Sequence, residues 1–239
     1  MRALLVVLLL IALPALAAER VDLELVLAAD GSGSIDDEEF RLQRQGYAAA
    51  ILHPEVLGAI RAGPHGAIAI ALLEWGAPES QPVIVDWTRI SDRASAEAFA
   101  QKLLAAPRQA HGYNSISNAL HRAAEMLREN AFAGTRRVID VSGDGPQIGG
   151  RPLEAVRQAI LAEGITINAL VVKTAGGGFR GPGSTPLDQH YRLDVICGPG
   201  AFVKVAETLQ NFAEAILAKM LLEISGLPAP AELAFGQSD

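Results

Sequence analysis

The order of apolar and polar residues along the chain predicts a series of strands. Residues 21–29 alternate in their first half and are then apolar throughout, which is typical of a strand entering a buried parallel sheet. Short apolar runs bounded by turn residues predict further strands at 67–75, 82–87, 137–141, 165–173 and 201–205. Because a turn-rich segment separates the runs at 67–75 and 82–87, these two are expected to form an antiparallel hairpin.

Between these runs, apolar residues recur at the spacing of a helix face. Helices are predicted at 40–52, 54–62, 94–105, 115–129, 152–163 and 207–224. An acidic run at 36–39 precedes the first of them, and we interpret it as helix-start chemistry, because carboxylates stabilise the positive end of the helix dipole. Strands that alternate with helices in this way predict a parallel sheet covered by helices on both faces.

The two ends of the chain differ from this alternating part. Residues 1–17 combine Arg2, an apolar run, Pro14 and small residues, and predict a signal peptide cleaved after Ala17. The apolar run is shorter than the ~20 residues of a membrane-spanning helix, so a retained anchor is the less favoured alternative. We expect an exported protein, periplasmic or extracellular, with one domain at 18–225 and a disordered tail at 226–239.

Charge and cysteine content narrow the classes of function. The formal net charge is −7 and no basic cluster occurs in the sequence, which argues against a nucleic acid or an anionic membrane as partner. Cys197 is the only cysteine and cannot form an internal disulfide, so we interpret it as a small buried apolar residue. Trp75 and Trp87 are interpreted as packing residues rather than as a recognition patch.

A candidate metal-binding motif follows the first predicted strand and has the sequence Asp30-Gly31-Ser32-Gly33-Ser34. Two-residue spacing sends alternate side chains of an extended backbone to one side, so Asp30, Ser32 and Ser34 can present oxygen atoms to one point. One carboxylate and two hydroxyls suit a hard cation such as Mg²⁺ or Mn²⁺, which keeps several of its waters. Such a site would be electropositive and open.

A second acidic segment follows the strand predicted at 137–141. Asp144 lies at the end of that strand, where ligands collect in open α/β sheets. Asp140 lies deeper, and we interpret it as a buried carboxylate hydrogen-bonded to backbone or hydroxyl groups rather than as a metal ligand. A Ser-His-Asp triad that includes His121 is disfavoured, because the serines lack the Gly-x-Ser-x-Gly context of such a nucleophile.

These motifs resemble the metal-ion-dependent adhesion site of von Willebrand factor A (VWA) domains. The Asp30 loop matches the first motif of that family, and Ser142-Gly-Asp-Gly145 is similar to the third, with Gly143 inserted before Asp144. Residues 111–120 are similar to the second motif, with Asn114 where the family has Thr. The sequence segments 74–75, 138–145 and 198–203 further resemble those of an uncharacterised family of secreted bacterial VWA-like proteins.

The resemblance covers nearly the whole chain after residue 17 and implies a fold. This is an α/β fold with a doubly wound, mostly parallel six-stranded sheet of order 3-2-1-4-5-6, one antiparallel edge strand and helices on both faces. It also implies a divalent-cation site, with Mg²⁺ favoured and Mn²⁺ or Ca²⁺ as alternatives. The implied ligands are Asp30, Ser32, Ser34, Asn114 and Asp144, and Ser115 stays open as an alternative to Asn114.

The function that the resemblance implies is binding rather than catalysis. The cation of such a site captures an Asp or Glu of a protein partner. Two other functions remain as alternatives. One is a metal-dependent hydrolase that activates a bound water, and the other is a structural periplasmic protein with a vestigial metal site.

Overall fold

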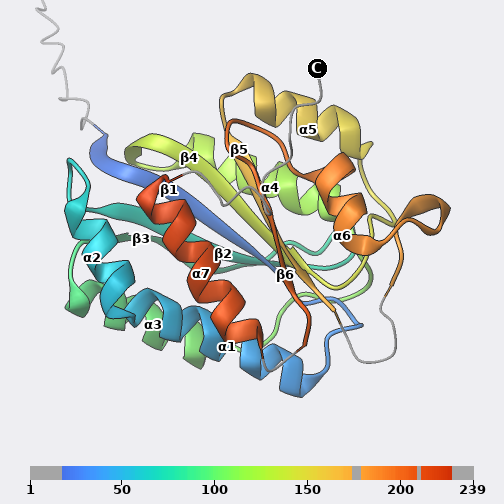
Figure 1. Ribbon diagram of the computed structural model, residues 1–239, viewed down its shortest axis with the longest axis horizontal. Coiled ribbons are helices and arrows are strands. Elements are labelled where there is room, and N and C mark those ends of the chain that lie inside the picture. The colour runs from blue at the N-terminus through green and yellow to red at the C-terminus, as the bar shows by residue number, and fades with distance from the viewer. Residues whose placement is uncertain (1–17, 174–178, 209–210, 228–239) are drawn as a thin grey trace, which may run out of the picture.

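The computed structural model describes residues 18–173, 179–208 and 211–227. Its strands form one six-stranded sheet in the order β3-β2-β1-β4-β5-β6, with helices on both faces (Figure 1). This confirms the predicted doubly wound order. The predicted signal peptide at 1–17 and residues 228–239 of the predicted tail lie outside the described residues.

The strands lie where the apolar runs predict them: β1 Glu19–Asp30, β2 Ile68–Trp75, β3 Val83–Ile90, β4 Phe132–Gly143, β5 Thr166–Val172 and β6 Val203–Ala206. The hairpin prediction is confirmed, because β3 runs antiparallel to β2, whereas the other neighbouring strands are parallel. β4 begins well before its predicted start at 137. The reason is its pairing with β1, which starts with Glu19 opposite Phe132.

Seven helices among the described residues enclose the sheet: α1 Asp37–Leu52, α2 Pro54–Ala62, α3 Arg93–Ala105, α4 Ile116–Glu129, α5 Leu153–Ala162, α6 Leu187–His190 and α7 Phe212–Ser225. α1, α2, α3 and α7 cover one face, and α4, α5 and α6 cover the other (Figure 1). Leu25 and Leu27 of β1 pack against the first group and Val26 and Ala28 against the second. This alternation follows from the two-residue period of a strand.

The start of α1 confirms the interpretation of the acidic run, whereas the start of α7 corrects the predicted start of the last helix. Asp36 and Glu39 form a capping box at the start of α1, in which each side chain accepts a hydrogen bond from the backbone N–H of the other residue. The predicted start of the last helix at residue 207 is wrong, because α7 begins at Phe212 and residues 207 and 208 form a bend. No helix within the described ranges has the length and hydrophobicity of a membrane-spanning segment.

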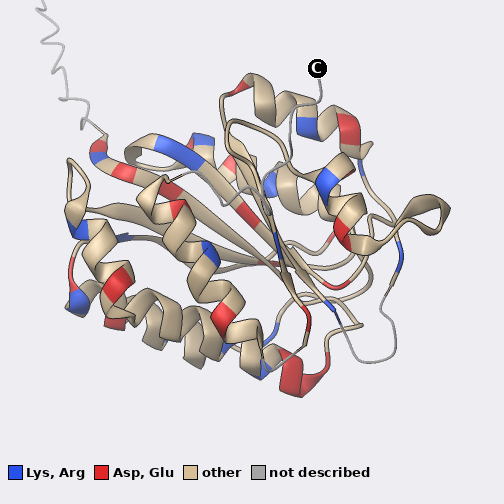
Figure 2. Cartoon of the chain, in the orientation of Figure 1, with Lys and Arg blue, Asp and Glu red and all other residues tan. Residues whose placement is uncertain are grey.

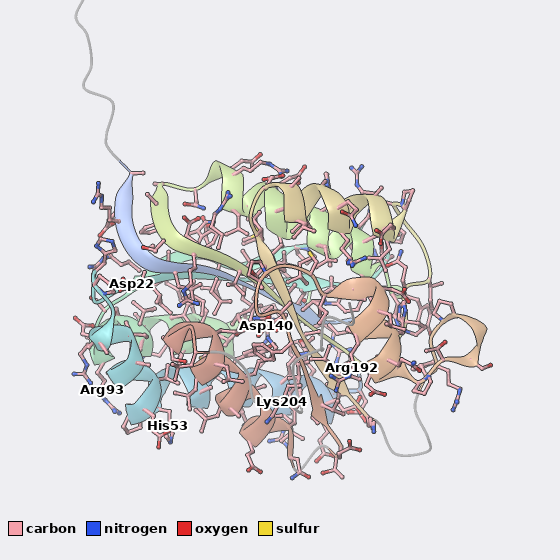
Figure 3. All side chains as sticks on the ribbon, turned by 45° about the horizontal axis from the view of Figure 1, so that its top comes forward. Asp22, His53, Arg93, Asp140, Arg192 and Lys204 are labelled. Atoms are coloured by element: carbon pink, nitrogen blue, oxygen red, sulfur yellow. The ribbon has the colours of Figure 1, made fainter. Side chains whose placement is uncertain are left out.

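A buried ionic cluster fastens α7 to the sheet. Lys219 Nζ lies 2.6 Å from Asp140 Oδ1 of β4 and also contacts Glu223 Oε1, one turn further along α7. Asn168 of β5 donates its side-chain N–H to Glu223 Oε1 at 3.1 Å. Asp140 is buried, as predicted (Figure 3), but its partner is a lysine from α7 rather than a backbone or hydroxyl group. Burial raises the pKa of Glu223 to about 7, and the negative charge of Asp140 contributes to this shift as a smaller cause.

The two tryptophans and the cysteine are packing residues, as predicted. Trp75 is buried, and its indole N–H donates to the carbonyl oxygen of Ala28 at 3.1 Å. Trp87 packs against Phe132 with ring centroids 6.3 Å apart. Cys197 is buried, and burial raises the pKa of its thiol. A thiol of this kind is a poor nucleophile.

Candidate metal-binding site

Four predicted ligands meet at the carboxyl ends of β1 and β4. Asp30 ends β1, and Asp144 directly follows β4. The Ser32 backbone N–H donates to Asp30 Oδ1 at 2.8 Å, and the Ser34 hydroxyl donates to Asp144 Oδ1 at 2.8 Å. The hydroxyl oxygens of Ser32 and Ser34 lie 3.0 Å apart. Neighbouring parallel strands therefore bring together two loops that are far apart in the sequence, at the point where the strand order reverses.

Asn114, in the loop before α4, lies beside this group. Its side-chain amide occupies the space over Gly145, where a Cβ would overlap Asn114 Nδ2. Asn114 Oδ1 is buried and has no hydrogen-bond partner in the described part of the chain. Ser115 is engaged differently, because its hydroxyl caps α4 and accepts the backbone N–H of Asn118 at 3.4 Å. The geometry therefore favours Asn114 over Ser115 as the fifth candidate ligand.

The electrostatics of the site fit a cation. Burial raises the pKa of Asp30 to about 7, and the negative charge of Asp144 contributes to this shift as a smaller cause. Burial also raises the pKa of Asp144. Asp144 Oδ2 is buried without a hydrogen-bond partner among the described residues. Two buried carboxylates resist joint ionisation, and a divalent cation would compensate their charge.

The donor set restricts the kind of metal. No group of three or more His, Cys, Asp or Glu side chains that could hold a metal occurs in the described ranges. The candidate site instead combines two carboxylates with hydroxyl and amide oxygens. Oxygen donors of this kind suit Mg²⁺, Mn²⁺ or Ca²⁺ better than metals that prefer sulfur or imidazole ligands.

A buried ion pair supports the loop that carries Asn114. Glu74 of β2 pairs with Arg44 of α1. The other carboxylate oxygen of Glu74 accepts the backbone N–H groups of Gln109 at 2.7 Å and Ala110 at 2.8 Å. The role of Glu74 was not predicted, although an acidic residue within an apolar strand is a sign of a buried partner. Glu74 thus links α1, β2 and the loop before α4.

The loop after β4 is supported by α6 and the turn that follows it, neither of which was predicted. The Tyr191 hydroxyl donates to the carbonyl oxygen of Gly145 at 3.0 Å. The Gln147 backbone N–H donates to His190 Nε2 at 3.3 Å. These contacts fix the backbone on the carboxyl-terminal side of Asp144.

Gly143, the residue inserted relative to the VWA motif, lies within the end of β4. A Cβ at this position would stand 2.7 Å from the Tyr191 hydroxyl and 2.8 Å from Trp75 Cζ2. Only glycine fits so close to these two rings. The Ser142 hydroxyl faces away from this contact and accepts the Tyr47 hydroxyl at 3.1 Å. The insertion is thus absorbed by close packing, and Asp144 still reaches Ser34.

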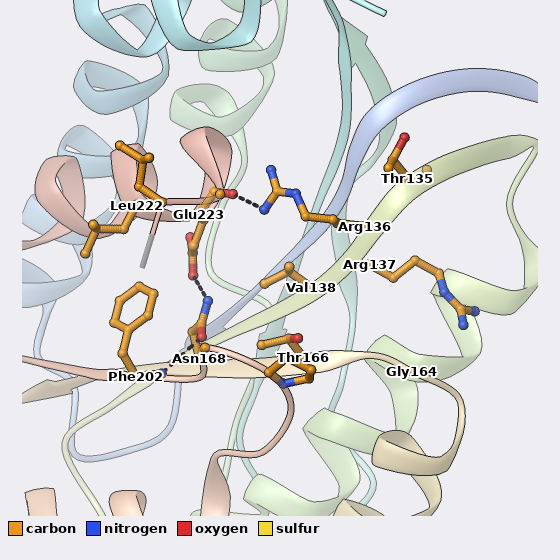
Figure 4. Close-up of a pocket in the computed structure, with 15 residues that line it drawn as sticks. Thr135, Arg136, Arg137, Val138, Gly164, Thr166, Asn168, Phe202, Leu222 and Glu223 are labelled. Atoms are coloured by element: carbon orange, nitrogen blue, oxygen red, sulfur yellow. Dashed lines mark hydrogen bonds between the residues drawn. The ribbon is translucent and has the colours of Figure 1, made fainter. Parts of the chain in front are cut away.

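A cavity of about 540 Å³ lies at the other end of the sheet (Figure 4). The first residues of β4 and β5 and the last turn of α7 line it. Arg136 donates to the carbonyl oxygens of Glu223 at 2.6 Å and Ile224 at 2.8 Å, so its guanidinium satisfies the carboxyl end of α7. The cavity is separate from the candidate metal site, since its lining comes from the amino ends of the strands.

Gly145→Ala is expected to lower the affinity for a divalent cation about tenfold or more, a typical loss when the support of a ligand is removed. The new methyl group would displace the Asn114 amide while leaving every candidate ligand in the sequence. Gly149→Ala is the matched control, because a Cβ there meets only Pro78 Cγ at 3.5 Å. Calorimetric titration with Mn²⁺ measures both variants, and equal losses would argue against a role for Asn114.

Comparison with known proteins gives a family match and several solved structures of similar fold. The chain matches the family model described as "Protein of unknown function (DUF1194)" over residues 20–228. No curated protein matches it. Among solved structures, the vWF domain of the type V pili tip protein Mfa5 from Porphyromonas gingivalis has a TM-score of 0.59 and 10% identity, and the match covers 92% of this chain and 98% of that one.

Two further structures are similar over a part of their length. The pilus adhesin SpaC from Lactobacillus rhamnosus GG, in its open conformation, has a TM-score of 0.63 and 13% identity, with 85% of this chain and 30% of that chain covered. Proximal thread matrix protein 1 from the mussel byssus, with a zinc-occupied metal-ion-dependent adhesion site (MIDAS) motif, has a TM-score of 0.60 and 16% identity. The match covers 87% of this chain and 46% of that chain. This chain thus spans less than half of either protein. The chain belongs to the DUF1194 family and has the fold of a von Willebrand factor A domain.

Proposed function

We propose that the protein is an exported VWA-like binding module, in which a divalent cation at the carboxyl ends of β1 and β4 captures an Asp or Glu of a protein partner. The observation that carries this proposal is the pair of buried oxygens without hydrogen-bond partners among the described residues, Asn114 Oδ1 and Asp144 Oδ2, beside the linked hydroxyls of Ser32 and Ser34. Buried polar atoms are rarely left without a hydrogen-bond partner, and a bound ion or water is one way in which such atoms are satisfied.

Each candidate ligand has a distinct role in this proposal. Ser32, Ser34 and Asn114 would hold the cation through neutral oxygens, while Asp30 and Asp144 would ligate it or orient its waters. Asp30 also accepts the Ser32 N–H, and Asp144 accepts the Ser34 hydroxyl, so the carboxylates position the serines. When bound, Mg²⁺, or Mn²⁺ or Ca²⁺ in its place, supplies the positive charge that attracts the carboxylate of the partner.

We favour binding over catalysis on chemical grounds. Oxygen ligands make Mg²⁺ a weaker activator of water than Zn²⁺ is in a hydrolase. Two of the similar structures lend support, since one is a pilus adhesin and the other has a zinc-occupied MIDAS motif. Export rests on the signal peptide predicted at residues 1–17, and a surface or periplasmic location agrees with an adhesive role.

The test is a calorimetric titration of Mg²⁺, Mn²⁺ and Ca²⁺ into the metal-stripped mature protein. We expect binding at a single site that is lost in Asp144→Ala, since the variant lacks the carboxylate that accepts the Ser34 hydroxyl. Asp86→Ala, which removes an exposed carboxylate of β3, should bind like the parent. If the parent binds none of the three cations at millimolar concentration, the site is vestigial. Divalent-dependent turnover of a phosphate or ester substrate would support the hydrolase instead.

A further inference from the structure

Two exposed apolar side chains flank the candidate metal site. Tyr113 is 61% exposed and Ile148 is 63% exposed. Tyr113 immediately precedes Asn114, and Ile148 lies in the loop that follows Asp144. A single exposed apolar residue is ordinary on a protein surface. Here, two large ones belong to two of the three loops that supply candidate ligands, which suggests that they contact whatever binds there.

Backbone contacts hold both residues against the ligand loops. The Ile148 N–H donates to the carbonyl oxygen of Asn114 at 2.9 Å. The Gly33 N–H donates to the carbonyl oxygen of Gly112 at 2.9 Å, and three atoms of the Tyr113 ring and hydroxyl lie 3.4 to 3.5 Å from where a Cβ on Gly33 would stand. Gly33 separates the two candidate serine ligands, so Tyr113 borders them directly. Because the backbones are already fixed, binding here has a reduced entropic cost.

A third border of the site is acidic. α1 begins three residues after Ser34, and its first turn contains Asp37, Glu38 and Glu39 (Figure 2). The side chains of Asp37 and Glu38 are exposed, at 108% and 72%, and they pair with Arg108 at 3.7 Å and Arg41 at 3.9 Å. Two guanidinium groups thus neutralise only part of the charge of the four carboxylates at 36–39. Like charges brought together across an interface disfavour binding. A partner segment that is rich in acidic residues would therefore be repelled, even if one carboxylate reached the cation.

We propose that the partner offers one carboxylate next to a bulky apolar residue in an otherwise uncharged or basic segment. The carboxylate occupies the cation site, and the neighbouring apolar side chain packs against Tyr113 and Ile148. The inference rests on the proposed function and adds the specificity of the site. Tyrosine suits this role, because it brings a large contact area with few rotatable bonds and is frequent among energetically dominant interface residues.

Short fluorescent peptides test the inference by anisotropy, in Mn²⁺ and in a chelator. The probes carry Leu-Glu, Gly-Glu, Leu-Gln or Glu-Glu-Glu at the centre of an otherwise Gly-Ser sequence. In Mn²⁺ the parent should bind the Leu-Glu peptide about tenfold more tightly than the Gly-Glu peptide. The Leu-Gln peptide should not bind, and the Glu-Glu-Glu peptide should bind no better than Gly-Glu.

Tyr113→Ala combined with Ile148→Ala should remove the preference for Leu-Glu and leave the Mn²⁺ affinity unchanged. Leu161→Ala is the matched control, since it truncates an exposed apolar residue near the end of α5, next to the amino end of β5. Equal binding of the Leu-Glu and Gly-Glu peptides, or a preference that survives the double substitution, overturns this inference alone. Failure of the parent to bind Mn²⁺ overturns the proposed function and this inference with it.

Discussion

Asp30→Asn is expected to abolish the thermal stabilisation that Mg²⁺ or Mn²⁺ gives the parent, without destabilising the metal-free protein. A ligand present at a hundred times its Kd stabilises the folded state by about 2.7 kcal/mol, which is roughly 5–10 °C in the Tm of a domain of this size. Burial and the charge of Asp144 raise the pKa of Asp30 to about 7, so its ionised form destabilises the metal-free folded state. The amide avoids that cost and still offers an acceptor to the Ser32 N–H.

Thermal unfolding in Mn²⁺ and in a chelator measures this effect. Asp86→Asn provides the comparison, because that carboxylate is exposed and the substitution makes the same chemical change. It should respond to Mn²⁺ like the parent. An Asp30→Asn protein that Mn²⁺ still stabilises would contradict the proposed role of Asp30 in holding the cation.

Lys219→Met is expected to destabilise the protein by about 3–5 kcal/mol at neutral pH, the usual cost of removing one partner from a buried ion pair. Methionine replaces the length of the lysine stem but leaves Asp140 and Glu223 buried without their cation. It also removes the contact of the ammonium with the Phe202 ring, whose centroid lies 5.6 Å from Nζ. Urea unfolding at several pH values measures the loss, which should shrink towards acidic pH as both carboxyl groups become protonated.

Glu223→Gln is the matched comparison for this cluster. Glu223 has a folded-state pKa of about 7 against an ordinary value of 4.5, so the folded protein binds more protons than the unfolded chain between these values. The stability contributed by Glu223 is therefore complete below pH 4.5 and is lost as pH rises through about 7. The Glu223→Gln variant should gain stability relative to the parent from about pH 5 to 8.

A Lys219→Met protein as stable as the parent at pH 7 would mean that the cluster carries no buried charge.

The fold and the convergence of the Asp30 and Asp144 loops could be predicted from the sequence. Apolar runs of strand length located the six strands, and the VWA motifs gave their order. Asn114 and Ser115 could not be separated from the sequence, because both offer an oxygen at almost the same position in the chain. Their surroundings in the structure differ, since α4 uses Ser115 as its cap and Asn114 Oδ1 lies buried beside Gly145, and this difference favours Asn114 as the candidate ligand.

The residues that support the site could not be predicted from local patterns. Glu74, which supports the loop before α4, pairs with Arg44 through packing between elements that are distant in the sequence. The same holds for Asp140 and Lys219, which fasten α7 to the sheet. A signal was available in α7, where Lys219 is followed by Glu223 one turn later in an otherwise apolar stretch. α6 is a single turn between Pro186 and a π-helical turn, so it has no helical periodicity to reveal it.

The central position of β1 has a consequence for the rates of folding and unfolding. β1 pairs with β4, more than a hundred positions later in the chain, and the Asp30–Asp144 site forms only when that pairing is complete. Contacts between such distant segments form slowly. A ligand that binds only after they form slows unfolding and leaves the folding rate almost unchanged. Divalent cations would thus lengthen the lifetime of the native protein without helping it to reach that state, which is the behaviour of a kinetically stabilised fold.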